Sequence, residues 1–316
     1  MLASKKKMII IYSVNRLYIQ KLPNKNIIML FIIGIFVVIG SVIGGYVMHH
    51  GKLEVLWQPN EFIIIFGAAI GSMLIGNPAK VLKGVLKSLK YLLKGSPYKK
   101  AHYVELLTML YMAFKTMKSK GLLEMESHIE NPKDSALFAP YQKFIKNHHA
   151  LHFFCDNVRV MTMGVEDHYQ IEELMERDLE AHHHEHERIA GSITTMGDAM
   201  PALGIVAAVL GVITTMGSIT EPPAVLGGLI GAALVGTFSG VLFSYGFIAP
   251  MGHLLSNYFE DEAKYVNCIK VALIAHLHGN APVVSIEFAR ACIDSTERPS
   301  FAEMDAAINN IGNKEG

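Results

Sequence analysis

The sequence predicts an all-α, polytopic membrane protein with four transmembrane helices and a large helical cytoplasmic region. The stretch from Ala199 to Phe259 holds a single charged side chain, Glu221, and is far longer than the roughly 20 residues that one membrane crossing needs. Two further apolar blocks lie near the N-terminus. No alternation of apolar and polar residues persists long enough to predict a strand.

The two N-terminal blocks predict a transmembrane hairpin over residues 27–76. Ile27–Met48 contains no charged residue and would form a helix of about 33 Å, which is enough to cross a bilayer. Phe62–Gly76 is shorter and could by itself be a buried soluble helix. Because it follows the first block so closely, a membrane hairpin is the favoured interpretation.

A second transmembrane hairpin is expected over residues 199–250. Its spans are Ala199–Ile219 and Val225–Pro250, joined at Glu221 and two prolines. Neither span contains Asp, Glu, Lys or Arg. If this hairpin takes part in ion movement, the acid that binds the ion is expected on another chain.

Lysines set the expected orientation. The loops 49–61 and 220–224 hold one Lys between them, whereas the N-terminal segment and the residues after Gly76 are rich in Lys. Positive charge stays on the cytoplasmic side, so both termini and the middle segment are expected in the cytoplasm. The first apolar block is too long for a cleaved signal. Residues 1–28 read as a basic extension that need not be native, with Met29 as a second possible start.

Two cytoplasmic helical regions are expected, over residues 77–197 and 251–316. Val104–Met117 places apolar side chains at helical spacing, and a turn follows near Pro132. Residues 171–189 read as a helix that continues into the third span. A further helical segment covers 257–297, with a break at 279–282.

Composition excludes several classes of function. Lys and Arg together number 28, as do Asp and Glu, so net charge points to no nucleic-acid partner. The three cysteines form no CxxC pair, which argues against zinc and disulfides. No nucleophile–base, Walker or dinucleotide motif is present, so no enzyme activity and no cofactor are expected.

Three local features leave alternatives open. The run from His182 to His186 could hold a metal, although its charged neighbours favour a solvated helix face and no metal site is expected. Pro201 and Pro250 could mark helix ends or act as hinges. The hydroxyl groups within the second hairpin could bond a carbonyl one turn back or line a hydrated path; they belong to Thr214, Thr215, Thr237, Ser239 and Ser244.

The order of several motifs resembles the A subunit of the bacterial flagellar motor stator, the MotA family. The matching stretches begin near Met29 and end at Phe301, and residues 1–28 find no counterpart. They are residues 40–46 (GSVIGGY), 58–65 (QPNEFIII), 124–132 (EMESHIENP), 197–209 (GDAMPALGIVAAV), 235–238 (VGTF), 245–250 (YGFIAP) and 297–301 (ERPSF). Each stretch is weak alone, and the combination in this order is specific.

The resemblance implies a proton-driven stator subunit of the inner membrane. In the family, five A subunits surround two B subunits of the MotB type, each with one membrane helix bearing the ion-binding Asp. The cytoplasmic part pushes on a rotor switch-complex protein of the FliG type. The alternative is an energiser of outer-membrane processes like ExbB or TolQ. Those relatives usually have three spans rather than four.

The resemblance also assigns roles to single residues. Pro201 and Pro250 match two prolines that couple ion binding to the cytoplasmic domain. Thr237 matches a pore-facing threonine. Ala208 stands where sodium-driven relatives carry another threonine, and since sodium needs hard oxygen ligands, protons are the expected ion. Lys118 and Glu126 match the charged pair of the rotor contact, where the usual cation is Arg.

Overall fold

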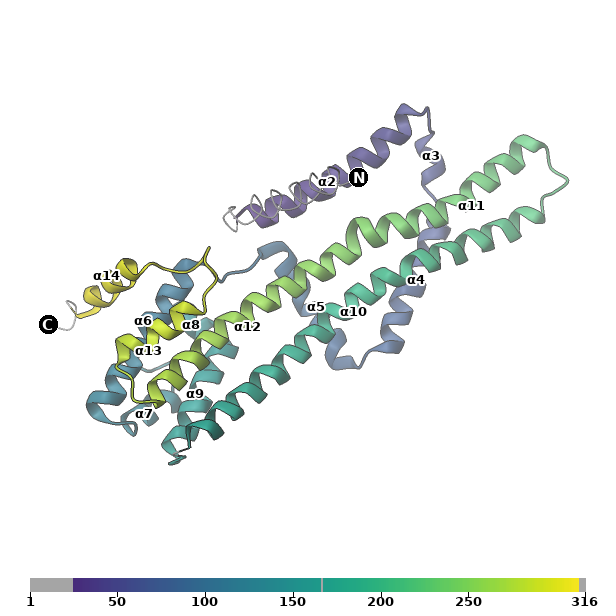
Figure 1. The fold of residues 1–316 in the computed structure, drawn as a ribbon. Coiled ribbons are helices and arrows are strands. Elements are labelled where there is room, and N and C mark those ends of the chain that lie inside the picture. Colours follow the sequence, from purple (N-terminus) through teal and green to yellow (C-terminus); the bar gives the residue numbers. More distant parts are fainter. Residues whose placement is uncertain (1–24, 166, 313–316) are drawn as a thin grey trace, which may run out of the picture. The chain divides into compact units, whose positions relative to one another are not determined.

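The computed structural model describes residues 25–165 and 167–312, and all the regular structure in this part of the chain is helical (Figure 1). The predicted basic extension falls largely outside the described residues. The elements are α2 (Lys25–Met48), α3 (Leu53–Leu56), α4 (Pro59–Gly76), α5 (Ala79–Lys94), α6 (Lys100–Lys120), α7 (Glu124–Glu130), α8 (Gln142–Lys146), α9 (His148–Thr162), α10 (His168–Met216), α11 (Pro223–Phe243), the π-helical turn η1 (Ser244–Ile248), α12 (Ala249–Leu277), α13 (Pro282–Ala291) and α14 (Phe301–Gly312).

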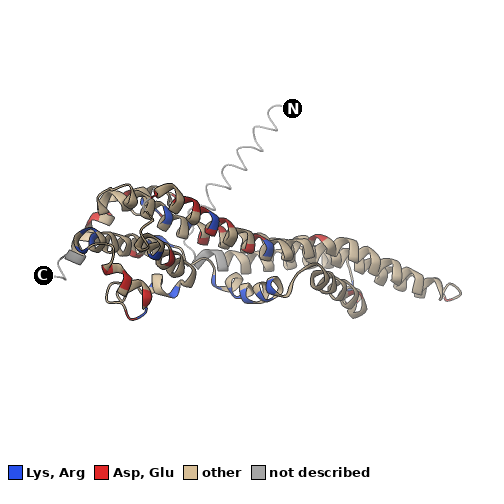
Figure 2. Cartoon of the chain, turned by 90° about the horizontal axis from the view of Figure 1, so that it is seen from below, with Lys and Arg blue, Asp and Glu red and all other residues tan. Residues whose placement is uncertain are grey.

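Within residues 25–165 and 167–312, four helices are long and apolar enough to cross a membrane, which confirms the predicted fold class. They cover residues 29–48, 53–76, 168–216 and 223–277. Figure 2 shows that the hairpin end formed by α10 and α11 is almost free of charged residues. The third and fourth of these helices are longer than one membrane crossing requires. Each also includes a polar portion outside its apolar stretch.

The third helix continues far beyond its apolar part, as predicted. α10 is one α-helix of 49 residues with Pro201 inside it. The fourth helix does not end at Pro250, because η1 and α12 extend it to Leu277. Both prolines therefore lie within helices, which is contrary to the alternative that they mark helix ends.

The described residues divide into two compact units, which we call the membrane unit and, after the location expected from the sequence, the cytoplasmic unit. The membrane unit comprises residues 25–95 and 184–258, and the cytoplasmic unit comprises residues 96–183 and 259–312. The cytoplasmic unit thus joins the middle and C-terminal segments that the sequence analysis treated separately. Contacts of α13 and α14 with α6 help to join them.

A core of small and medium side chains holds the membrane unit together. Ile65 and Ala69 of α4 are buried with Met200 and Ala207 of α10. Phe243, at the end of α11, packs on the edge of this cluster, with its ring 4.9 Å from that of Phe66. α4 also contacts α11.

Large aromatic side chains fill the core of the cytoplasmic unit. Phe138, Phe144 and Phe154 are fully buried and surround one another, with ring centroids 5.8 to 6.1 Å apart. Tyr265 of α12 is buried between Tyr98 and Tyr103. Burial of rings of this size contributes most of the apolar area of such a core.

Candidate ion-conduction site

Glycines let α10 and α11 approach until their backbones touch. A methyl group on Gly240 would lie 2.6 Å from the Met200 carbonyl oxygen and 2.9 Å from the Gly204 Cα. One on Gly204 would lie 2.7 Å from the Gly236 carbonyl oxygen. These distances leave no room for a side chain. We call Gly204, Gly236 and Gly240 the glycine seam, the small-residue contact typical of membrane helices.

Glu61 of α4 enters this site, and the sequence analysis assigned it no role. Its side chain is 8% exposed, although it belongs to the first turn of an apolar helix. A methyl group on Gly236 would lie 2.7 Å from Glu61 Oε2, and one on Gly211 would lie 3.3 Å from Oε1. The carboxyl group therefore fits against α10 and α11 because positions 211 and 236 are glycines. A larger side chain at either position would fill the same space.

One oxygen of this carboxyl group lacks a hydrogen bond. Glu61 Oε2 is buried and has no partner among the residues that the structure describes. Burial of a polar group without a hydrogen bond costs free energy, so such a group needs an explanation, and a functional role is one. Glu61 is thus a candidate site residue on geometric grounds.

Ala208 and Gly236 lie on the two sides of the same contact, and Thr237 follows Gly236 in the sequence. Ala208 is buried in α10, and its backbone nitrogen would lie 3.0 Å from a methyl group on Gly236, the residue before Thr237. Thr237 is half-buried in α11. The structure therefore brings Glu61, Ala208 and the Gly236–Thr237 segment to one place.

Two hydroxyl groups of the second hairpin bond a backbone carbonyl of their own helix. Thr214 donates to the Leu210 carbonyl at 3.0 Å and Thr215 to the Gly211 carbonyl at 2.9 Å, so both bond one turn back. The Ser244 hydroxyl is buried without a partner in the described residues. It marks the start of η1.

Pro201 and Pro250 lie near a second close contact. Gly197, one turn before Pro201, is tight against Ala249, the residue before Pro250: a methyl group on Gly197 would lie 3.1 Å from the Ala249 backbone nitrogen. Pro201 is half-buried and Pro250 is exposed. η1 directly precedes Ala249, and single π turns inside α-helices are frequent at functional sites.

Lys118 and Glu126 belong to the cytoplasmic unit and not to the site just described. Lys118 lies in the last turn of α6 and Glu126 in the first turn of α7, and both side chains are exposed. Nearby, Lys120 and Glu124 form an ion pair of 3.3 Å. This corner of the unit is an exposed, charged surface.

The histidine run lies on α10, and one of its members packs in the cytoplasmic unit. The His182 ring stacks on His149 of α9, with centroids 3.4 Å apart. Burial, then the nearby His182 and His152, lower the pKa of His149 to about 4. Within residues 25–165 and 167–312, no three His, Cys, Asp or Glu side chains gather in a way that could hold a metal ion.

The sequence carried one signal for Glu61, which is an acid directly before the apolar run from Phe62 to Gly76. The same position is ordinary for an acid, because Asp and Glu are favoured in the first turn of a helix. Only its burial against the glycine seam distinguishes Glu61 from the exposed Glu54.

Comparison with known proteins gives matches over most of the chain. Residues 32–121 match the family described as Motility protein A N-terminal, and residues 140–267 match the MotA/TolQ/ExbB proton channel family. Motility protein A of Escherichia coli (strain K12) is 42% identical over 285 residues, which is 90% of this chain and 97% of the relative. The chemotaxis protein LafT of Vibrio parahaemolyticus is 34% identical over 86% of this chain and 96% of its own length.

Solved structures have the same fold. The C. jejuni MotAB structure matches 86% of this chain and 99% of its own, with a TM-score of 0.71 and 22% identity. The flagellar MotAB stator complex of Bacillus subtilis matches 81% of this chain and 92% of its own, with a TM-score of 0.62 and 27% identity. On the 42% identity over nine-tenths of its length, the chain belongs to the Motility protein A family.

Proposed function

We propose that this chain is the A subunit of a proton-driven flagellar motor stator. The observation that carries the proposal is the glycine seam, where Ala208, the Gly236–Thr237 segment and Glu61 meet. The same positions of the sequence carry the family motifs. The relatives named Motility protein A, rather than TolQ or ExbB, favour motility over the energising of outer-membrane processes.

Protons fit this site better than sodium ions. Sodium binding needs several hard oxygen ligands, by the same reasoning as for other hard cations. Ala208 supplies no side-chain oxygen to such a site. Thr237 and Ser239 of α11 and Glu61 of α4 provide polar groups near the seam.

The partner that completes the site is a B subunit of the MotB type. Its membrane helix supplies the acid that α10 and α11 lack within residues 199–219 and 225–250. MotAB complexes among the structural neighbours support this pairing. We infer five A chains around two B chains in the inner membrane, with both termini in the cytoplasm.

Glu61 adds an acid that belongs to the A chain itself. α4 begins at Pro59, so Glu61 lies near the first end of this span. The distribution of lysines predicts that this end faces outward. An acid there can receive a proton before it passes to the B-subunit Asp. Lys118 and Glu126, exposed on the cytoplasmic unit, are available to a rotor protein of the FliG type.

The test is complementation of a strain that lacks its own stator. The chain is expressed with its cognate B subunit, and swimming is measured after sodium is replaced by potassium and after a protonophore is added. We expect swimming that is indifferent to sodium and abolished by the protonophore. Loss of swimming without sodium would contradict the choice of ion.

The two helix prolines give the test of coupling. Pro201→Ala and Pro250→Ala should each abolish swimming while the protein still inserts and flagella still assemble. Pro222→Ala, in the exposed turn between α10 and α11, is the matched control and should swim normally. Normal motility in both helix variants would refute the hinge role.

A further inference from the structure

A short helix directly after the second span carries three distinct faces. α5 covers Ala79–Lys94 and begins three residues after α4 ends at Gly76. At 100° per residue, its five lysines fall within an arc of roughly 80°. They are Lys80, Lys83, Lys87, Lys90 and Lys94.

A second face holds α5 against the protein. Val81, Val85, Ser88 and Leu92 are all buried and lie on the side opposite the lysines. Gly84 is in close contact with α10, because a methyl group there would lie 2.6 Å from Ile189 Cδ1. α5 is therefore seated on the membrane unit rather than free.

The third face is apolar and exposed. Leu86 is 71% exposed, Leu93 is 66% exposed and Leu89 is 38% exposed. A helix with a basic face beside an apolar face is typical of one that lies in the plane of a membrane surface. The start of α5, directly after a span, fits the same location.

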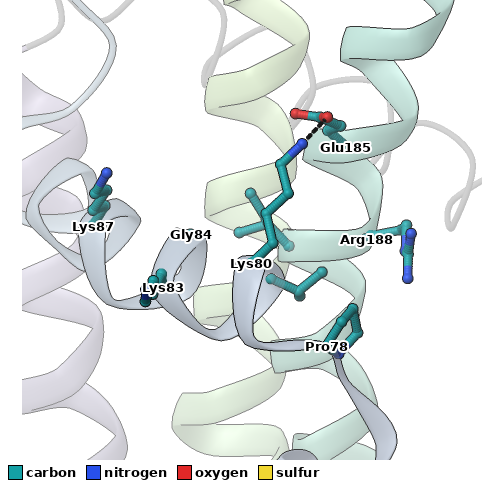
Figure 3. A pocket seen from close by; sticks show the side chains of 9 residues that line it. Pro78, Lys80, Lys83, Gly84, Lys87, Glu185 and Arg188 are labelled. Carbon is teal, nitrogen blue, oxygen red and sulfur yellow. Dashed lines mark hydrogen bonds and ion pairs between the residues drawn. The ribbon is translucent and has the colours of Figure 1, made fainter.

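A cavity of about 360 Å³ opens beside the basic face, between α5 and α10. Lys80, Lys83, Lys87 and Arg188 line it, with Glu185 as its carboxylate. Figure 3 shows the Lys80 ammonium reaching Glu185, while Arg188 projects from α10. The ion pair uses one cation, so Lys83, Lys87 and Arg188 leave an excess of positive charge at the cavity.

We propose that this cavity binds the headgroup of an anionic phospholipid from the membrane surface at which α4 ends. The phosphodiester would lie among Lys83, Lys87 and Arg188, since guanidinium and ammonium groups form charge-assisted hydrogen bonds with phosphate oxygens. The acyl chains would cover Leu86 and Leu93. Clusters of four to eight basic residues beside a membrane helix are typical of anionic-lipid binding.

A lipid explains both open faces at once, which a free anion does not. Inorganic phosphate would satisfy the cations and leave the leucines in water. An acidic peptide would not require a basic face that starts directly after a span. The inference needs only that α4 crosses the membrane, so it does not depend on the choice of coupling ion or on rotor contact.

The experiment is native mass spectrometry of the chain with its B subunit in neutral detergent. Short-chain phosphatidylglycerol, short-chain phosphatidylcholine and inorganic phosphate are titrated separately. We expect phosphatidylglycerol to bind more tightly than phosphatidylcholine. At about tenfold for each 1.4 kcal/mol and about 1 kcal/mol per basic residue, the triple variant K83Q/K87Q/R188Q should bind it on the order of 100-fold more weakly.

Two control variants distinguish the loss of positive charge at the cavity from a loss of folding. K83R/K87R/R188K keeps every positive charge and should retain binding. K133Q/K146Q/R177Q removes three exposed cations of the cytoplasmic unit and should change nothing. Equal affinity for the two lipids, or unchanged binding by K83Q/K87Q/R188Q, would overturn the proposal. Displacement of phosphatidylglycerol by an equal concentration of phosphate would assign the site to a free anion instead.

Discussion

The membrane unit and the cytoplasmic unit are both helical, yet they pack in different ways. In the cytoplasmic unit, Phe138, Phe144 and Phe154 fill the space between helices. In the membrane unit, Gly204 and Gly240 let the backbones of α10 and α11 touch. In water the burial of large apolar groups drives packing. In lipid that force is absent, and close contact of helices replaces it.

The largest expected effect follows from the cytoplasmic core. Phe154→Ala should lower the free energy of unfolding by about 3–5 kcal/mol, because it leaves a cavity inside an aromatic cluster. Phe301→Ala is the control, since that ring is 61% exposed, and should cost less than about 0.5 kcal/mol. Denaturant unfolding in detergent measures both. Similar losses for the two variants would refute the importance of the buried cluster.

The next prediction concerns the addition of a methyl group, whereas the first concerned the removal of a side chain. Gly240→Ala should destabilise the protein by about 1–3 kcal/mol, since the methyl group meets backbone atoms that cannot move aside. Gly231→Ala, on the same helix with nothing within 4 Å of the added group, should be neutral or stabilising because Ala favours helix. Thermal unfolding in detergent checks the difference in sign. Equal effects would mean that the glycine seam is not tightly packed.

A smaller effect depends on pH and concerns the cytoplasmic unit alone. The pKa of His149 is lowered to about 4, first by burial and then by His182 and His152. The unfolded state therefore binds more protons between about pH 6.5 and 4. Stability should fall as the pH drops through this window.

The variant that tests this dependence is His149→Gln. It should flatten the loss of stability between pH 6.5 and 4, as measured by thermal unfolding at several pH values. His148→Gln, at an exposed position of the same helix, should leave the slope unchanged. An identical pH dependence in wild type and His149→Gln would rule out His149 as its source.

The smallest change in stability is expected for a variant of Glu61, which should nevertheless impair function. Glu61→Gln keeps the shape of the side chain, so the unfolding midpoint should hardly move, while proton flow and swimming speed should fall. Glu54→Gln changes an exposed acid of the neighbouring α3 and should do neither. Full proton flow in Glu61→Gln would remove Glu61 from the ion path.

Much of the fold could be predicted because it depends on local composition. The four apolar helices and the continuation of α10 beyond its apolar part both follow from runs of residues that are contiguous in sequence. The break after α12 was visible as Gly279 and Pro282, and Gly279 does adopt a positive φ of 82°. Features of this kind are determined by residues that are close together in the sequence.

Other features depend on contacts between distant segments, and these could not be predicted. The packing of α13 and α14 on α6 joins residues far apart in sequence. η1 shows no pattern of its own in Ser244–Ile248. The burial of Glu61 depends on Gly211 and Gly236, each more than a hundred residues away, whose missing side chains provide the space.

That last contact has a consequence for how the family can change in evolution. The space that the Glu61 carboxyl group fills is the space that a methyl group on Gly236 would need, so the two positions share one fixed volume across two helices. A relative that gains a side chain at position 236 should have both a shorter residue at position 61 and a wider spacing of α10 and α11 there, because the added methyl group would also lie 3.0 Å from the Ala208 backbone nitrogen. Substitutions at these two positions should therefore co-vary among relatives.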